Sequence, residues 1–492
     1  MEPIVACPPC GPQNAVAQFG ETNLGSTRAW CPECQTVEHA LYSATGEGVF
    51  MERICPRQGV RRTPVCRTKE WFFERTRQPR RMWQNRHPEP VKQGCPHDCG
   101  ICAHHAGALR LPIFSITNNC NLKCPICFTH NRQDKIYNKS LEELETLLDV
   151  IEAEKQDLDL LNLTGGEPTL HPNLDEILQR CARRSFRRVS MNSNGLLLGK
   201  NRKLAEKLKE TGVQVILSLD TLKPDKSIRI HGADIAQGKA NALAMLEELN
   251  IPTVLLMVWI PGINDEELPA LIEEWLPKKF ICGITIQNMA YTGQYGSLFS
   301  PRIHSTLEDV EQGLARWGNF AAGDFFAHGS YHPFCYSSAY FIIDGALRIP
   351  FTSLASADLL MAATEESYLL KPLPELERSF RARIDERWAE GAPREELAVL
   401  KRFIARMNDE DARAPGFSHE MVKTVTIHAH MDEDNFDLAR VSLCGDLVPH
   451  EDGRMIPACS YNLLYRQRDE RFWTEGSASP PATPTGKPLN KE

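Results

Sequence analysis

The sequence predicts an α/β protein built around a parallel sheet, and three observations lead to this class. Six short apolar runs follow one another at 112–117, 158–164, 186–191, 213–219, 253–260 and 281–288. The segments between them are long enough for helical crossovers, which parallel strands require. Cysteines gather in short-spaced groups before and within this region. We therefore expect an open or partial six-stranded barrel preceded by a cysteine-rich module.

Composition divides the 492 residues into five consecutive parts. We expect a cysteine-rich module over 1–90, a cysteine loop over 91–110, the β/α repeat over 111–300, an α+β extension over 301–475 and a tail over 476–492. The tail is rich in Pro, Ser, Thr and Gly, a composition that buries too little apolar surface to fold. We expect the tail to be disordered.

The overall composition indicates a soluble globular protein. Hydrophobic residues make up 42% of the chain and charged residues 24%, and no apolar run approaches the roughly 20 residues of a membrane span. The N-terminus lacks a secretory signal, so we expect a cytoplasmic location. In that reducing compartment, seventeen cysteines favour metal ligands over disulfides. A net charge of −8 argues against a general nucleic-acid binder.

One segment departs from this acidic balance. The stretch from Arg57 to Arg86 contains ten Lys or Arg residues, both ends included, interleaved with Trp71, Phe72, Phe73 and Trp83. A solvated basic linker is one interpretation. The other is a docking face for a phosphate or an anionic headgroup, in which the aromatic side chains make peripheral contact with a membrane surface.

The N-terminal cysteines predict a small module stabilised by a metal ion. C-x2-C pairs stand at Cys7/Cys10 and Cys31/Cys34, and single cysteines follow at Cys55 and Cys66. A module of this size gains much of its stability from a bound ion, here a tetrahedral iron or zinc. One quartet of ligands is Cys31, Cys34, Cys55 and Cys66, and Cys7 and Cys10 could replace two of them.

Two later loops share the spacing C-x3-C-x2-C. The first contains Cys95, Cys99 and Cys102, and the second contains Cys120, Cys124 and Cys127. Three thiolates in this spacing can hold three corners of a cubic iron–sulfur cluster, leaving the fourth iron free to bind a small molecule. A zinc knuckle is the alternative, but it usually pairs two C-x2-C hooks. Only the second loop follows the first strand of the repeat, so we expect the chemistry there and an auxiliary cluster at the first loop.

Polar residues and glycines follow the next three predicted strands. They are Gly165, Gly166 and Glu167 after the second strand, Asn194 after the third, and Ser218 and Asp220 after the fourth. Because functional loops gather at the carboxyl ends of parallel strands, these residues should meet the second cysteine loop. The helix between the first two strands begins with a capping box of Ser140 and Glu143.

The ordered motifs resemble those of radical S-adenosylmethionine (SAM) enzymes, which implies a partial (β/α)6 radical SAM barrel. By this resemblance Cys120, Cys124 and Cys127 hold a [4Fe-4S] cluster whose open iron binds the amine and carboxylate of SAM. Electron transfer then yields a 5′-deoxyadenosyl radical that takes hydrogen from inert carbon. The implied cofactor-binding residues are Phe128 near adenine, Gly165, Gly166 and Glu167 near the methionine amine, Asn194 near the ribose, and Ser218 and Asp220.

A narrower resemblance covers most of the chain. The motifs at 94–105, 117–128, 165–169, 332–335 and 435–462 are similar to those of tetraether-lipid synthases and a related pterin methylase. This resemblance implies that Cys95, Cys99 and Cys102 hold an auxiliary cluster. It makes Cys335, Cys444 and Cys459 the fourth ligand of that cluster or the ligands of a third one. Where this group has Cys-Pro-Glu-His-Gly the chain has Gln58, which excludes a histidine ligand and favours Cys66.

These resemblances predict a radical SAM enzyme that forms a carbon–carbon bond at an unactivated C–H group. We expect lipid hydrocarbon chains as the substrate, and a ferredoxin or flavodoxin as the electron donor. C-methylation of a pterin or another heterocycle is the alternative. A hypothesis of another class is a non-catalytic iron–sulfur electron carrier or scaffold. His332, His428 and His430 are expected to be structural, and Cys181 and Cys282 to be buried apolar residues.

Overall fold

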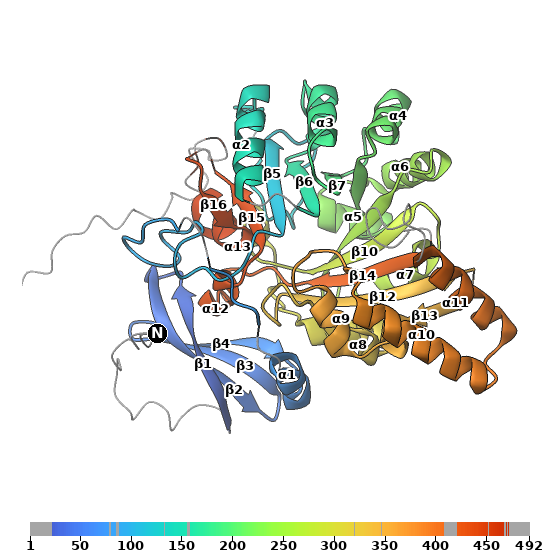
Figure 1. Ribbon diagram of the computed structural model, residues 1–492. Coiled ribbons are helices and arrows are strands. Elements are labelled where there is room, and N and C mark those ends of the chain that lie inside the picture. The colour runs from blue at the N-terminus through green and yellow to red at the C-terminus, as the bar shows by residue number, and fades with distance from the viewer. Residues whose placement is uncertain are drawn as a thin grey trace, which may run out of the picture.

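The computed structural model describes residues 22–471 except 78–79, 85–87, 132, 155–157, 319, 346, 408–420, 451, 467–468 and 470. The predicted disordered tail, Cys7 and Cys10 lie outside the described residues. Figure 1 shows the N-terminal sheet below a larger unit, in which helices form an arc around a curved sheet.

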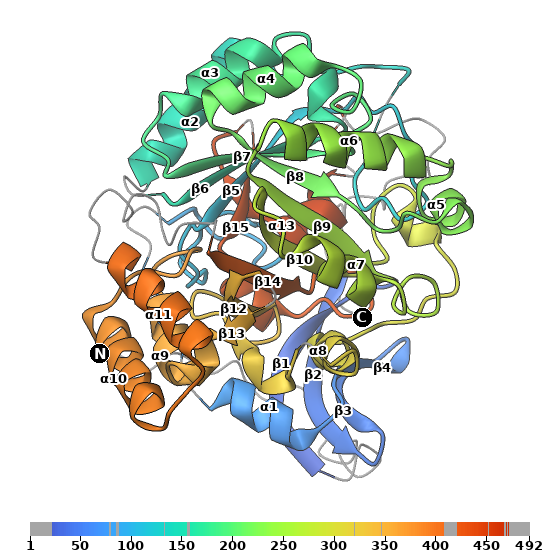
Figure 2. The same ribbon diagram turned by 90° about the vertical axis from the view of Figure 1, so that its right-hand side faces the viewer.

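The six predicted strands of the repeat are all present and parallel. They are β5 (Leu111–Thr117), β6 (Leu160–Gly165), β7 (Arg188–Ser193), β8 (Gln214–Ser218), β9 (Thr253–Trp259) and β10 (Ile281–Asn288), and they pair in this order. The connecting helices cover the outer face (Figure 2): α2 (Leu141–Glu154), α3 (Leu174–Ala182), α4 (Arg202–Thr211), α5 (Pro224–His231), α6 (Ala236–Glu248) and α7 (Leu268–Trp275). The predicted partial barrel is therefore confirmed.

The sheet continues beyond these six strands at both edges. β14 (Val422–His428) pairs in parallel with β10, and β12 (Tyr336–Asp344) pairs antiparallel with β14. The short strands β11 (Phe326–Ala327) and β13 (Leu347–Pro350) flank β12. At the other edge β15 (Asp446–Pro449) pairs in parallel with β5 and antiparallel with β16 (Met455–Pro457). The late segment therefore carries His428 to the end of the sheet at which β10 also ends.

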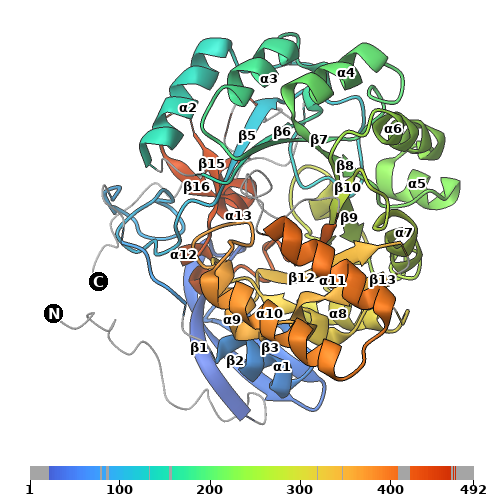
Figure 3. The same cartoon turned by 45° about the vertical axis from the view of Figure 1, so that its right-hand side comes forward.

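The helices of the C-terminal extension enclose a second apolar core. Its residues include Phe351, Phe380 and Phe403, whose rings lie within 5.7 Å of one another. Figure 3 shows these helices in front of the sheet: α9 (Ala357–Ala363), α10 (Pro374–Ala389) and α11 (Arg394–Met407). Three further helices, α8 (Leu307–Ala315), α12 (Leu438–Ser442) and α13 (Ala458–Ser460), lie outside this core. The predicted α+β extension is confirmed.

The N-terminal module is an antiparallel meander followed by one helix. Its elements are β1 (Thr22–Cys31), β2 (Thr36–Thr45), β3 (Gly48–Cys55), β4 (Gly59–Cys66) and α1 (Lys69–Thr76). The module is joined to the extension at Asp437, whose carboxylate accepts hydrogen bonds from Thr27 (2.6 Å) and Tyr42. The backbone N–H of Trp30 also donates to the carbonyl of Phe436 at 3.1 Å.

The basic segment with aromatic residues forms part of this junction, so the prediction of a docking face fails for Trp71 and Phe72. Both are buried, and the Trp71 indole donates to Glu311 at 2.8 Å; Phe73 remains exposed. Most of the arginines form ion pairs: Arg61–Glu33, Arg62–Glu52, Arg67–Asp309, Arg75–Glu311, Arg77–Asp358 and Arg81–Glu366. Within the part of the chain that the structure describes, no helix is long and apolar enough to cross a membrane.

Candidate active site at the carboxyl ends of the barrel strands

The cysteine loop after β5 is held from several directions. Within the loop, the N–H of Cys127 donates to the carbonyl of Cys124 at 3.0 Å. The Gln133 amide donates to the carbonyl of Cys120 at 2.8 Å, and the N–H of Gly296, beyond β10, donates to the carbonyl of Cys127 at 2.9 Å. The loop backbone is therefore fixed before any ligand binds.

Burial disfavours the deprotonated form of the thiols in this loop. Burial raises the pKa of the Cys120 thiol to about 12, and Glu167 and Cys127 add to the effect. Burial also raises the pKa of Cys124, again with a contribution from the neighbouring loop cysteines. Irons would hold these thiols as thiolates, since metal coordination offsets the cost of deprotonation. The donor set of Cys120, Cys124 and Cys127 therefore suits an iron–sulfur cluster.

Gly165 and Gly166 bring the end of β6 against this loop. A Cβ atom on Gly165 would lie 2.2 Å from the carbonyl oxygen of Thr117, and one on Gly166 would lie 2.1 Å from that of Asn119. Gly165 also has a φ of +140°, which residues with a side chain rarely adopt. The N–H groups of Gly166 and Glu167 donate to the same two carbonyls at 2.8 and 2.7 Å. These glycines therefore set the position of the segment just before Cys120.

The buried Glu167 carboxylate links the ends of β6 and β7. It accepts hydrogen bonds from the hydroxyls of Thr169 (2.6 Å) and Ser193 (2.8 Å) and from the N–H of Asn194 (2.7 Å). The Asn194 side chain in turn donates to Asn121, within the cysteine loop, at 2.7 Å. Glu167 and Asn194 therefore fix the geometry around the loop.

Lys239 belongs to this site although the sequence did not reveal it. Its fully buried ammonium group donates to the carbonyl oxygen of Asn194 at 2.8 Å, and to the carbonyl and hydroxyl oxygens of Ser218 at 2.6 and 2.8 Å. Burial lowers the pKa of Lys239, and the carboxylate of Asp220 opposes that shift. The sequence does contain one indication of this role. Lys239 lies on the buried face of α6 with Ala242, Leu243 and Leu246, where a charged side chain needs a partner.

Asp220 lies behind the cysteine loop. One carboxylate oxygen accepts from the N–H of Val258 at 2.6 Å, and the other lies 3.6 Å from Nε2 of His231. The Nδ1 atom of His231 is 3.8 Å from the sulfur of Cys124. Burial raises the pKa of Asp220 to about 6 and lowers that of His231 to about 3. Asp220 thus lies near the histidine beside Cys124 without a hydrogen bond to it among the described residues.

Comparison with known proteins accounts for this arrangement. Residues 114–274 match the radical SAM superfamily, and this range contains the cysteine loop and the ends of β6, β7 and β8. The chain carries a radical SAM domain. The protein is therefore an enzyme of this superfamily, and the fold implies a [4Fe-4S] cluster that binds SAM.

Two curated relatives extend the comparison. The 7,8-dihydro-6-hydroxymethylpterin dimethyltransferase of Methanocaldococcus jannaschii is 27% identical over 421 residues, which cover 78% of this chain and 82% of the relative. A probable GTP 3′,8-cyclase of Pyrococcus abyssi is 35% identical over 159 residues, which cover 32% of this chain. The chain spans 50% of that cyclase.

Two similar solved structures each cover less than half of the chain. Streptococcus suis SuiB bound to S-adenosylmethionine gives a TM-score of 0.37 with 19% identity over 43% of this chain and 47% of SuiB. The radical S-adenosylmethionine methyltransferase TsrM from Kitasatospora setae gives a TM-score of 0.28 with 15% identity over 48% of this chain and 47% of TsrM.

Phe128 extends from the radical SAM domain toward the C-terminal extension. Its ring centroid lies 5.4 Å from that of His430, just beyond the end of β14. The Nδ1 atom of His430 is 3.7 Å from the sulfur of Cys459, and its ring lies 4.0 Å from that of His428. The sequence had assigned only structural roles to these histidines. In the structure, His430 lies between Phe128, which follows the cysteine loop after β5, and Cys459.

Two of the C-terminal cysteines, Cys335 and Cys459, interact with a buried arginine. The guanidinium of Arg440 donates to the sulfur of Cys335 at 3.4 Å and to the carbonyl of Ala429 at 2.5 Å. Burial raises the pKa values of Cys335, Cys444 and Cys459, to about 12 for Cys459. Each of the three thiols interacts electrostatically with at least one of the others. The structure therefore groups these three cysteines together.

The loop of Cys95, Cys99 and Cys102 lies beside the C-terminal segment. The Tyr465 hydroxyl accepts from the N–H of Cys99 at 2.8 Å and donates to the carbonyl of His97 at 2.5 Å. A hydrogen bond between the Cys95 and Cys99 side chains lowers the pKa of Cys95. Cys99 and Cys459 belong to one apolar cluster. Cys459 therefore lies close to the loop of Cys95, Cys99 and Cys102 as well as to Cys335.

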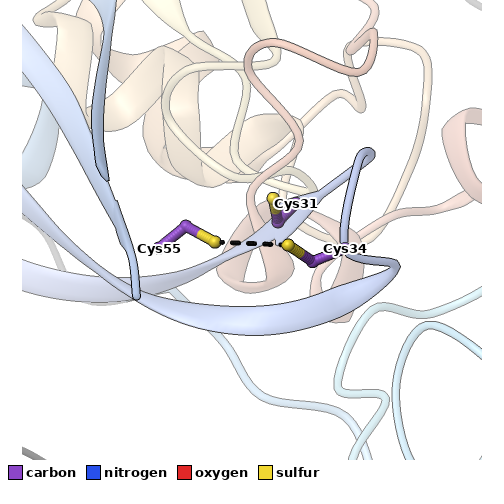
Figure 4. A group of neighbouring side chains, drawn as sticks. All are labelled: Cys31, Cys34 and Cys55. Atoms are coloured by element: carbon purple, nitrogen blue, oxygen red, sulfur yellow. Dashed lines mark hydrogen bonds between the residues drawn. The ribbon is translucent and has the colours of Figure 1, made fainter. Parts of the chain in front are cut away.

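The structure does not assemble the predicted N-terminal quartet. Cys31, Cys34 and Cys55 form a group whose ligand atoms all lie within 4.8 Å of one another (Figure 4). Cys66 is absent from this group of described residues, because it pairs with Val49 at one end of β3 whereas Cys55 pairs with Gly59 at the other end. The Cys66 thiol donates to the carbonyl of Thr68 at 3.3 Å instead. The assignment of Cys66 as the fourth ligand is therefore corrected.

A cavity lies between the module, the ends of β10 and β14, and α12. Its volume is about 40 Å³. Its lining combines the rings of Tyr42 and Phe334 and the apolar side chains of Met51, Val65, Met289 and Leu307 with polar side chains that include Asn288, His304, His430, Asn435, Asp437 and Arg440. His430 both lines this cavity and contacts Phe128. The cavity is therefore connected through one side chain to the cysteine loop of the radical SAM domain.

Proposed function

We propose that the protein is a radical SAM enzyme that methylates carbon on a nitrogen heterocycle, with a pterin-like molecule as the substrate. The observation that carries this proposal is the polar lining of the cavity beside His430. The side-chain oxygen of Asn288, which lines the cavity, has no hydrogen-bond partner among the described residues, and a hydrocarbon chain would leave it unpaired at a cost of about 1–3 kcal/mol. A heterocycle with an N–H group can donate to it.

The aromatic residues of the cavity support the same substrate class. The rings of Tyr42 and Phe334 meet edge to face at a centroid distance of 5.7 Å, and both line the cavity. A flat heterocycle can pack against such rings once the lining side chains move apart, because the cavity as it stands has a volume of only about 40 Å³. The M. jannaschii relative, which is similar over most of both chains, is named a pterin dimethyltransferase. The lipid substrate stays a prediction, and the polar lining does not favour it.

Different residues of the chain would bind the cluster and the parts of SAM. Cys120, Cys124 and Cys127 would hold the SAM-binding cluster, which supplies the electron that cleaves SAM. The backbone around Gly166 would accept from the methionine amine, Asn194 would lie near the ribose, and Phe128 near adenine. Ser218 and Asp220 support this site through Lys239 and His231.

Auxiliary clusters complete the proposal. Cys95, Cys99 and Cys102 would hold one cluster, and Cys335, Cys444 and Cys459 would hold another. Because His430 contacts both Phe128 and Cys459, the second of these lies next to the proposed substrate cavity. We propose a cytoplasmic location and reduction by a ferredoxin or flavodoxin.

The test uses the full chain with its clusters reconstituted without oxygen. Incubated with SAM, dithionite as the electron source and a dihydropterin, the enzyme should release 5′-deoxyadenosine and methionine from one SAM, S-adenosylhomocysteine from a second SAM that donates its methyl group, and a pterin heavier by one or two methyl groups, all measured by mass spectrometry. Cys124→Ala should abolish both products, whereas Cys181→Ala, which changes a buried cysteine of α3, should retain them. Release of 5′-deoxyadenosine together with modification of an alkyl lipid, but not of the pterin, would contradict the substrate assignment.

A further inference from the structure

Two polar side chains lie beside the sulfur of Cys127, and both belong to the segment that follows the cysteine loop. The hydroxyl oxygen of Thr129 is 3.1 Å from this sulfur. The side-chain amide of Asn131 donates to the same sulfur at 3.6 Å. Both residues follow Cys127 within four positions, so the local turn of the backbone places them there. Two side-chain donors therefore reach one ligand of the proposed SAM-binding cluster.

The direction of the Thr129 hydrogen bond depends on the state of Cys127. The Thr129 hydroxyl also lies 3.3 Å from Oδ1 of Asn131, so its single proton has two acceptors within reach. A free thiol at Cys127 can donate to Thr129 and leave the hydroxyl proton to Asn131. A thiolate bound to iron carries no proton, so the 3.1 Å contact is then favourable only when the hydroxyl donates to sulfur. With a cluster bound, Thr129 and Asn131 therefore both donate to Cys127.

The loop after β10 holds both donors in place. The N–H of Gln294 donates to the carbonyl of Thr129 at 3.2 Å, and the Gln294 side-chain oxygen accepts from the N–H of Asn131 at 3.1 Å. Gly293 allows this close approach, because a Cβ atom there would lie 2.2 Å from the carbonyl carbon of Phe128. Its φ of +83° is also a conformation that residues with a side chain rarely adopt. The sixth strand of the barrel thus positions donors for a sulfur that follows the first strand.

Hydrogen bonds to the sulfurs are one of the factors that set the reduction potential of an iron–sulfur cluster. Reduction adds one negative charge to the cluster. A hydrogen bond to a more negative acceptor is stronger, so a donor beside a cluster sulfur stabilises the reduced form more than the oxidised form. Donors at Cys127 therefore favour the reduced cluster, which is the form that transfers an electron to SAM.

We propose that Thr129 and Asn131 are positioning residues that raise the reduction potential of the SAM-binding cluster by donating hydrogen bonds to the sulfur of Cys127. This inference rests on the proposed assignment of Cys120, Cys124 and Cys127 to that cluster. Thr129 contributes the larger part, because its contact is 3.1 Å long against 3.6 Å for Asn131. An electron carrier then needs less reducing power to load the cluster.

Potentiometric titration of the full chain with its clusters reconstituted, followed by electron paramagnetic resonance, tests this proposal. The signal to follow is the component that SAM alters and that Cys124→Ala lacks. At a fixed potential, Thr129→Val should lower the ratio of reduced to oxidised cluster about tenfold, which is 59 mV for a one-electron couple. Asn131→Leu should lower this ratio about threefold. Thr129→Ser retains the hydroxyl, so its ratio should stay within about twofold of that of the unmodified chain.

Thr146→Val is the matched control, since the exposed Thr146 hydroxyl donates to the carbonyl of Glu142 within α2 and should not affect the potential. The proposal is overturned if Thr129→Val or Asn131→Leu titrates like the unmodified chain, or if Thr129→Ser shifts as far as Thr129→Val. Equal shifts in the cluster signals that SAM does not alter would also overturn it, because the effect would then not be local. A SAM-dependent signal that survives in Cys124→Ala would instead refute the cluster assignment, and this inference with it.

Discussion

The cysteine loop of the barrel and the cysteine group of the N-terminal module assemble their donors in different ways. In the barrel, three cysteines lie within eight residues, and each supporting motif follows a parallel strand. In the module, the donors come from two hairpin turns. Topology therefore determines which residues meet in the first case, and hairpin register determines it in the second. The spacing of residues along the chain therefore predicts which residues meet only where the strand topology brings the ends of successive strands together.

The two sites also differ in what lies behind the sulfurs. Backbone packing at Gly165 and Gly166 holds the barrel loop. A buried arginine, Arg53, lies behind the module site and donates to the carbonyl of Trp30 at 2.7 Å. The first support is steric and the second electrostatic, so substitutions should damage the two sites in different ways.

The largest effect is expected from Gly166→Ala. The new Cβ would lie 2.1 Å from the backbone oxygen of Asn119, which cannot move without displacing the cysteine loop. Overpacking of this kind costs about 3 kcal/mol, and iron content at the loop together with 5′-deoxyadenosine release should fall at least 100-fold. Gly323→Ala is the matched control, since its Cβ would contact nothing within 4 Å. Equal iron content in both variants would show that the loop does not depend on this glycine.

A smaller effect is expected from Arg75→Met, which tests the dependence of the module on the larger unit. The buried Arg75 guanidinium pairs with Glu311 at 2.6 Å, and its removal leaves a buried carboxyl group without its cation. Loss of one partner from a buried pair costs about 3 kcal/mol. Denaturant unfolding should show this loss, whereas Arg77→Met, which removes an exposed pair, should change the stability by less than about 1 kcal/mol. Similar losses in both variants would contradict the structural role of the buried pair.

Lys239→Met should weaken SAM binding with less effect on stability. Without the ammonium group, the carbonyls of Asn194 and Ser218 lose a shared donor, at about 1–3 kcal/mol. The ends of β7 and β8 should then shift, and SAM affinity measured by calorimetry should fall about tenfold while iron content is unchanged. Lys209→Met, at the exposed end of α4, is the control. Unaltered affinity in Lys239→Met would remove this lysine from the site.

The smallest effect concerns pH and the pair of His304 and Asp432. Burial alone would lower the pKa of His304, but the Asp432 carboxylate at 3.0 Å outweighs it and raises the pKa, with Asp434 adding to this shift and Arg302 opposing it. The protonated His304 stabilises the fold fully at pH values below the unfolded pKa of about 6.5. This stabilisation is lost as the pH rises through the higher pKa of the folded state. His304→Gln should therefore cost about 1 kcal/mol at pH 6 and almost nothing at pH 9. A cost independent of pH would contradict the ion pair.

The barrel was predictable because its signals are local. All six strands and the motifs at 165–167 and 194 follow from apolar runs and the rule that functional loops gather at strand ends. Lys239 was missed because lysines usually lie at the surface, so its place on the apolar face of α6 was not taken as a sign of a buried role. Cys66 was misplaced because cysteine spacing contains no information on hairpin register. His430 was undervalued since β14 joins the sheet from 134 residues beyond the end of β10, a pairing that sequence periodicity does not reveal.

The most direct test of the account is electron paramagnetic resonance of the reduced, reconstituted enzyme with and without SAM. The account predicts that SAM changes the cluster spectrum of the unmodified chain, and that this change persists when Cys31, Cys34 and Cys55 are replaced by Ser. Replacing Cys120, Cys124 and Cys127 by Ala should eliminate it. A SAM-dependent change that survives in the second variant would contradict the assignment of the barrel loop as the site of SAM binding.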